Sequence, residues 1–311
     1  MTAKLMLSFF QFFARHGRAV LIAGLVVGIA VPPLAMAMKT YLPELIGFLL
    51  FVTALRIDPV AALSKGAGLG RTAGIVVLYQ LFIPVVALAA FWFLGWQGGL
   101  ALGLVLMLAA PSIASSANIA ILSGHDGTGA LRLMVLGTAL VPLTAFPIFF
   151  LLPQLGEISA VLGASVRLLL IIFVAAIAAV VVRRLFLNEM AQTTVEALDG
   201  FAALTMAVVV IALMAAMGPA LWNEPWRFVG VMIVACAVNF GLQVVGWWIA
   251  PWLGSQRDRA GLAIIMGNRN LGLFLTALPL SVTDPLLLFI GCYQVPMYLT
   301  PLVMGWLYRK N

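Results

Sequence analysis

Charged residues are scarce in this sequence, and their scarcity excludes a soluble globular protein. Only 9% of the 311 residues are charged, whereas 64% are hydrophobic and the mean hydropathy is +1.16. A soluble fold cannot bury so large an apolar fraction in its core. We therefore expect an all-α, multi-pass protein of the lipid bilayer, located in a bacterial inner membrane.

Histidine and cysteine are also rare, which argues against several kinds of site. The two histidines, His16 and His125, fall in polar segments between apolar runs, and neither an H-E-x-x-H nor a G-x-S-x-G motif occurs. Cys236 and Cys292 fall in apolar segments, where a thiol behaves as a small hydrophobe. We expect no enzyme activity, no disulfide, no metal site and no cofactor, with Na⁺ considered only as a candidate coupling ion.

The apolar runs are long enough for ten membrane-spanning helices. A span needs about 20 apolar residues, so the uncharged stretch 72–124 must contain two spans, separated near residues 95–99. The second span is the shortest, because Glu44 and Arg56 bound it closely. The expected spans are approximately 18–38, 42–57, 74–94, 99–123, 131–153, 165–184, 200–221, 226–250, 259–280 and 285–307.

The distribution of basic residues predicts the topology. Of the 17 Lys and Arg residues, only Lys39, Arg167 and Arg227 fall on the side opposite the N-terminus, and Arg269 lies within a span. By the positive-inside rule, both termini are expected in the cytoplasm. This asymmetry also accounts for the net charge of +7, so a nucleic-acid partner is unnecessary. The oligomeric state has no signal in the sequence.

An internal repeat is visible in the pattern V-P-x-x-x-x-P, which occurs at 141–147 and again at 295–301. The span before each copy is interrupted by small and polar residues, P-S-I-A-S-S-A-N at 111–118 and G-N-R-N at 267–270. Five spans in each half make the second half inverted relative to the first. Inverted repeats with interrupted helices at corresponding positions are typical of secondary transporters. The repeats cover approximately residues 18–153 and 165–307.

The interruptions are the candidate binding site. A broken membrane helix frees backbone groups that lipid cannot satisfy, so we expect the two interrupted spans to meet inside the bundle. There, helix N-termini attract anions, while carbonyl, hydroxyl and amide oxygens can coordinate a cation. The same residue types also serve helix packing. The candidate ligands of substrate or ion are Gln80, Ser115, Ser116, Asn118, Thr138, Asn268 and Asn270.

Arg269 is the most unusual of the candidates. An arginine at the centre of a span costs about 2.5–3.5 kcal/mol on insertion scales, so it should face the bundle interior and have a partner. No acidic residue lies in the middle of a span to pair with it. Its expected partners are therefore backbone carbonyls at the break or a bound anion.

These features together resemble the bile acid:sodium symporter family, within the wider bile acid, arsenite and riboflavin transporter superfamily. The resemblance covers essentially the whole chain and is strongest at P-x-x-x-S-S-A-N and G-N-R-N-L-G-L. It implies ten spans, with helices one, two, six and seven as a panel and helices three to five and eight to ten as a core. It also implies that helices four and nine cross near two sodium sites.

Transferred to this chain, the family's helix-four Ser-Asn pair falls on Ser116 with Asn118 if Ala117 is an inserted residue; otherwise Ala117 takes the place of the asparagine. The helix-five threonine falls on Thr138, and the helix-three glutamine falls on Gln80 or, with a shift of one residue, on Tyr79. Helix nine departs from the sodium-binding members, which read Glu-x-Gly-x-Gln-Asn. Here Ile265 replaces the glutamate and Arg269 the glutamine. A fixed positive charge opposes sodium binding nearby.

Arg269 thus either replaces a coupling cation or binds the carboxylate of an organic anion. The expected function is alternating-access transport of small organic anions. A sodium-independent carrier, working by proton coupling, exchange or uniport, is the alternative. An arsenite-type efflux permease and a channel are less favoured. Arsenite transport would favour a thiolate near the helix-four break, and this chain has no cysteine there.

Overall fold

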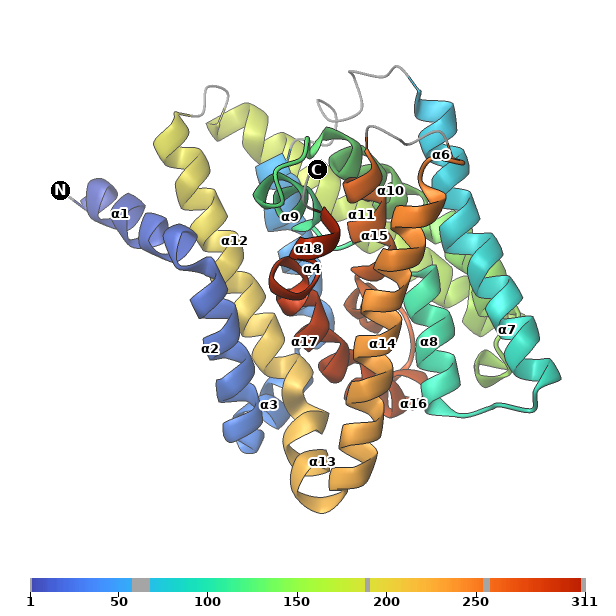
Figure 1. Cartoon of the computed structure of the whole chain (residues 1–311). Helices are drawn as coiled ribbons and strands as arrows, with labels where there is room; N and C mark the ends of the chain where they lie inside the picture. Colours follow the sequence, from blue (N-terminus) through green and yellow to red (C-terminus); the bar gives the residue numbers. More distant parts are fainter. Residues whose placement is uncertain (1, 58–67, 188–190, 254–257, 309–311) are drawn as a thin grey trace. The chain divides into compact units, whose positions relative to one another are not determined.

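The computed structural model describes residues 2–57, 68–187, 191–253 and 258–308, which are largely α-helical and contain no β-strand (Figure 1). Six of the described helices are long and apolar enough to cross a membrane, and up to eight spans result if two bent helix pairs each count as one. These helices make the chain an all-α, multi-pass membrane protein.

The chain forms two compact units. The first consists of Met1–Pro59 and Leu170–Pro225, and the second of Val60–Leu169 and Trp226–Asn311. The first unit holds the expected spans 18–38, 42–57 and 200–221 and most of 165–184. The second holds the other six expected spans. The chain passes between the units at three points, and one of them, after Leu169, falls within the long helix α11 (Ile158–Phe186).

The first unit is organised around α12 (Gln192–Leu213), which packs against the four helices at the start of the chain. Glycines allow close approach: a Cβ at Gly24 would lie 2.8 Å from the carbonyl oxygen of Ala207, and one at Gly28 would lie 2.7 Å from the Met214 side chain. Small residues at such contacts are typical of membrane helices. The remaining elements of this unit are α1 (Thr2–Arg15), α2 (Gly17–Ala30), α3 (Pro32–Lys39), α4 (Leu42–Ile57), η3 (Met214–Ala216) and α13 (Met217–Asn223).

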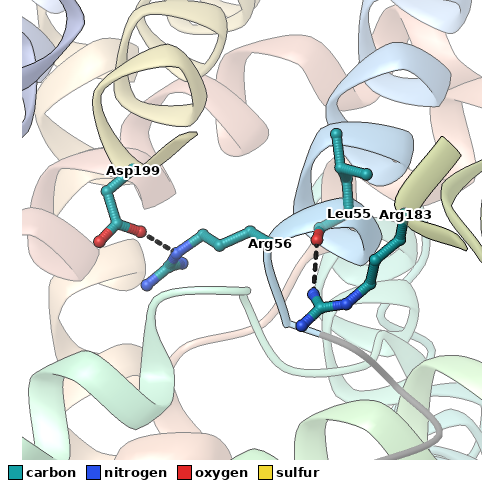
Figure 2. A network of polar contacts seen from close by, with 4 residues as sticks. All are labelled: Leu55, Arg56, Arg183 and Asp199. Atoms are coloured by element: carbon teal, nitrogen blue, oxygen red, sulfur yellow. Dashed lines mark hydrogen bonds and ion pairs between the residues drawn. The ribbon is translucent and has the colours of Figure 1, made fainter. Parts of the chain in front are cut away.

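The polar end of α4 is held by two arginines, as Figure 2 shows. Arg56 forms an ion pair with Asp199 of α12, and Arg183 Nη1 of α11 donates a hydrogen bond of 2.9 Å to the carbonyl of Leu55. Arg183 therefore satisfies one of the carbonyls left free at the end of α4. The observed bounds of α4 coincide with those expected for the second span.

The first expected span, 18–38, is not one helix. It divides at Val31, where φ is −122° and ψ is 70°, between α2 and α3. The physical cause is the Pro32-Pro33 pair, because proline lacks an N–H and disfavours helical geometry in the preceding residue. Instead, α3 and α4 form a pair bent by 79°.

The second unit contains one long, continuous helix made of α6 (Leu69–Val77), η1 (Leu78–Phe82) and α7 (Ile83–Phe93). Its other long helices are α10 (Thr128–Phe150) and α14 (Pro225–Ile249), and α11 begins here. The shorter elements are α8 (Gly99–Ala109), α9 (Ser116–Leu122), η2 (Pro153–Leu155), α15 (Arg259–Gly267), η4 (Leu271–Thr276), α16 (Leu280–Thr283), η5 (Asp284–Leu286), α17 (Leu287–Val303) and α18 (Gly305–Tyr308).

Exposure separates the helices that face lipid from those inside the second unit. Within α14 only Ala235, Asn239, Gln243 and Gly246 are buried, and exposed tryptophans lie at its two ends, Trp226 at one and Trp248 at the other. This is the pattern of a span anchored at both membrane interfaces. In α8, by contrast, every residue from Ala101 to Ala109 is buried. A helix that is apolar all round and buried all round lies within the protein.

Candidate functional site

The expected fourth span, 99–123, is interrupted. Helix α8 ends at Ala109, Ala110 is extended with φ −69° and ψ 148°, and α9 begins only at Ser116. Pro111 explains the interruption, since it has no N–H to donate and pushes the residue before it out of the helical region. The chain between the two helices therefore carries backbone groups that need partners from elsewhere.

The expected ninth span, 259–280, is interrupted at the corresponding place. Helix α15 ends at Gly267, and Asn268 and Asn270 are non-helical before the short 3₁₀ segment η4. The two breaks lie side by side: Ser112 and Arg269 form an antiparallel bridge, Ile113 N donates to Asn268 O at 3.1 Å, and Asn270 N donates to Pro111 O at 2.7 Å. Each break thus satisfies backbone groups of the other.

The end of α15 is held tightly by its neighbours. A Cβ at Gly267 would collide with the carbonyl of Asn239 and the side chain of Gln243, so α14 can approach only a glycine here. The Gly267 carbonyl accepts hydrogen bonds from the Asn239 amide and from the Tyr293 hydroxyl. These two side chains, from α14 and α17, fix the position at which the helix stops.

A polar network continues from this point through the interior of the second unit. Gln243 donates to Asn239 Oδ1 at 2.7 Å and to Thr300 Oγ1 at 3.1 Å, and it accepts from the Tyr308 hydroxyl. Thr300 Oγ1 in turn donates a hydrogen bond of 3.1 Å to Asn268 Oδ1. All five side chains are fully buried. A buried network with its members hydrogen-bonded fixes one arrangement of the helices that carry it.

Gln80 and Tyr79, the two alternatives for the helix-three position, are both buried. The segment η1 that carries them is a π-helical turn, a rare geometry that is frequent at functional sites. Gln80 Nε2 donates to Gly137 O at 3.3 Å, and Thr144 Oγ1 donates to Gln80 Oε1 at 3.2 Å. Tyr79 lies under Arg269 instead.

Arg269 is 1% exposed and lies at the junction of the two breaks. Its Nε donates to Met266 O at 2.9 Å and its Nη1 to Ala110 O at 3.2 Å, while its Cζ lies 4.2 Å from the centre of the Tyr79 ring. Within the described residues, Nη2 has no hydrogen-bond partner and no carboxylate pairs with the guanidinium. The arginine therefore has the backbone-carbonyl partners that its position predicts, and one nitrogen left over.

The candidate residues divide into two groups. Ser116, Asn268 and Arg269 are buried and hydrogen-bonded at the junction, where Ser116 Oγ lies 2.5 Å from Ser112 Oγ, and Gln80 is buried and hydrogen-bonded to α10. Asn270 contributes its backbone N–H. The structure does not bring the remaining candidates into this network: Ser115 and Asn118 are exposed, and Thr138 Oγ1 donates to Met134 O of its own helix at 2.9 Å.

Sequence reasoning did not include Tyr293, Thr300 or Tyr308 among the candidates. Thr300 is the sixth residue of the second V-P-x-x-x-x-P copy, whereas Thr144 is the fourth residue of the first, so aligning the two copies does not pair them and gave no signal for Thr300. Tyr293 and Tyr308 had no signal either, since a tyrosine in an apolar helix is indistinguishable by pattern from a packing residue.

Two carboxyl groups lie outside the membrane-spanning segments at one end of the second unit, and their pKa values shift in opposite directions. Asp126 accepts hydrogen bonds from the hydroxyl and the N–H of Thr128, at 2.7 and 2.9 Å, which lower its pKa. Partial burial raises the pKa of Asp258, and the nearby Asp126 carboxylate adds to the increase, while Arg132 and Arg71 oppose it.

Comparison with known proteins adds no relationship: no family model matches the sequence, and a search of curated proteins finds no match. The resemblance drawn from the motifs therefore stays a prediction, and the case for function depends on the geometry of the junction.

Proposed function

We propose that the protein is a secondary transporter that moves small organic anions across the bilayer by alternating access. The observation that carries the proposal is the buried guanidinium of Arg269 at the meeting point of two discontinuous helices. A permanent charge buried in a membrane protein without an acidic partner is costly, and such residues generally mark the path of a substrate or ion. Its unpartnered Nη2 is available to a carboxylate.

The proposal includes ten spans arranged as two inverted repeats. The hydrogen bonds support this arrangement, because Gln80 bonds to Thr144 of α10 and Gln243 bonds to Thr300 of α17. Both threonines belong to the helices with paired internal prolines. In this scheme, the interrupted elements α8–α9 and α15–η4 are the fourth and ninth spans.

The presence of two compact units supports the proposal that the protein consists of a panel domain and a core domain. The core, with the junction, corresponds to the second unit, and the panel to the first. Movement of one against the other would give access from either side of the membrane in turn. Both termini are proposed to lie in the cytoplasm of a bacterium, and the proposed relationship is to the bile acid:sodium symporter family.

Identifying the substrate class is the first experimental step. The purified protein is screened by thermal shift against small mono- and dicarboxylates and larger carboxylated or sulfonated sterols, each with choline as the counter-ion. Ligands that raise Tm are then tested as labelled substrates in proteoliposomes. We expect saturable uptake or exchange, since a carrier must complete a conformational cycle for each substrate.

The test variant is Arg269→Ala, which should abolish uptake while the protein keeps its size-exclusion profile. The matched control is Arg184→Ala, which removes an exposed arginine at the end of α11. We expect its uptake to equal that of the wild type. Uptake that survives Arg269→Ala at the wild-type rate would refute the site, and a non-saturating flux would indicate a channel.

A further inference from the structure

The carbonyls at the two breaks have an unusual set of partners. A helix leaves its last four carbonyls without intrahelical partners, and in a membrane each must be satisfied by the protein. At the end of α15, Ile264 O accepts from the side-chain amide of Asn268 at 2.8 Å, and Gly267 O accepts from Asn239 and Tyr293. Met266 O differs, because its side-chain donor is the charged Nε of Arg269.

Arg269 joins the two interrupted helices through their carbonyls. Met266 belongs to α15, whereas Ala110, whose carbonyl accepts from Nη1, follows directly on α8. The aromatic face of Tyr79 from η1 lies 4.2 Å from the guanidinium carbon. Carbonyls from two broken helices and an aromatic face thus converge on one positive charge.

Carbonyl oxygens and an aromatic face are groups that bind monovalent cations. Carbonyls of unwound membrane helices bind sodium in transporters because their partial negative charges replace the hydration shell. An aromatic face attracts cations through its quadrupole. Arginine cannot lose its proton in a protein, so its charge is permanent and, unlike an ion, cannot dissociate. A second cation at this junction would be repelled, and strongly so in a buried site.

We propose that Arg269 is a tethered cation, which permanently takes the place of a dissociable coupling ion between the two breaks. The two roles of the guanidinium use different atoms, since Nε and Nη1 hold the carbonyls and Nη2 is left for the substrate anion. The inference rests on the proposed function, in that it treats the junction as the ion site of a carrier, and it makes that carrier independent of sodium. Tyr79 is a positioning residue in this scheme, since it holds the guanidinium over its ring.

The inference is tested by thermal unfolding of the full-length protein in detergent. The wild type is compared in NaCl, KCl and choline chloride at equal ionic strength, and we expect no sodium-specific increase in Tm. Arg269→Ala is expected to unfold at a temperature lower by roughly 5 °C or more. Methylguanidinium chloride at millimolar concentration should restore part of that loss relative to choline, by occupying the vacated position.

The control is Arg259→Ala, because this arginine also donates to a carbonyl, Trp247 O at 2.7 Å, and also stacks on an aromatic ring, with Cζ 4.4 Å from the centre of Trp247. It lies at the start of α15, away from the junction. Methylguanidinium should not raise the Tm of this variant, nor that of the wild type. The Tyr79→Phe variant should have nearly the same Tm as the wild type, because it keeps the aromatic ring, whereas the Tm of Tyr79→Leu should be lower.

Each outcome decides the inference. A saturable, sodium-specific increase in the Tm of the wild type would overturn it, as would a folded Arg269→Ala that does not respond to methylguanidinium. Should Arg269→Ala fail to fold, the wild-type salt series and the Tyr79 pair decide instead. Absence of anion transport alongside the expected thermal behaviour would refute only the proposed function, and sodium-dependent anion transport would refute only the tethered cation.

Discussion

Replacing Thr300 with valine tests whether the polar network holds α17 to the break in helix α15. The Thr300 hydroxyl lies 3.1 Å from Gln243 Nε2 and 3.1 Å from Asn268 Oδ1, and all three groups are buried. Valine keeps the shape but leaves one amide N–H and one amide oxygen without partners. Each orphaned group costs about 1–3 kcal/mol in soluble proteins, whereas interhelical hydrogen bonds in a membrane protein average only about 0.6 kcal/mol. Two bonds at the membrane value give about 1 kcal/mol and two orphaned groups at the soluble value give at least about 2 kcal/mol, so we expect a loss of about 1–3 kcal/mol.

The matched control is Thr205→Val in α12. Thr205 is also buried, but its hydroxyl donates only to Phe201 O in the same helix, at 2.9 Å. Its loss orphans no side chain, so the expected change is under about 0.5 kcal/mol. The free energy of unfolding is measured by reversible titration with SDS in mixed micelles. Equal effects of the two substitutions, or a Thr300 variant as stable as the wild type, would refute the network as a stabilising element.

Two further predictions concern a close contact and a titration. Gly137→Ala should destabilise the protein, because the new Cβ would lie 2.8 Å from the Tyr79 hydroxyl. The control is Gly163→Ala, whose Cβ would have no atom within 4 Å and which should be neutral or stabilising, because alanine has the higher helix propensity. The two variants are compared by thermal unfolding. For Asp258, whose pKa is raised above 3.8, stability is lost as pH rises through the folded-state pKa. Asp258→Asn should therefore raise Tm at pH 7 but not at pH 3.5, whereas Asp126→Asn should lower Tm at pH 7, and a Tm–pH series without this opposition would contradict the assignment.

The sequence was sufficient to locate both breaks, because their causes are local. Pro111 removes a backbone donor, and G-N-R-N places a glycine and two weak helix formers in succession. The cost of a charge in a membrane also predicted that Arg269 has carbonyls or an anion as partners. The sequence did not identify these carbonyls, because Ala110 lies 159 positions away in the chain and is brought close only by the tertiary fold.

Two features of the structure did not follow from the sequence patterns, each for its own reason. Ser115 and Asn118 were assigned to the site from their nearness in sequence to the break, but α9 begins at Ser116 and both residues are exposed, outside the buried network; their role as ligands stays a prediction. The helical periodicity that decides which residues are buried starts anew after a break. The pattern of buried residues before the break therefore does not predict which residues are buried after it. The division of 18–38 at Val31 was signalled by two adjacent prolines, which the count of apolar residues ignored.

The π-helical turn at Leu78–Phe82 has a consequence for how this chain tolerates insertions and deletions. A π turn holds one more residue than the α turn it interrupts, so deleting a single residue there would relax the segment to a regular α-helix. The flanking segments α6 and α7 would keep their facing, because the π turn accommodates the extra residue, but only one of the two buried positions now held by Tyr79 and Gln80 would remain. The register of this helix therefore couples the arginine's aromatic contact to the glutamine's bonds with α10, and a one-residue deletion would have to sacrifice one of them.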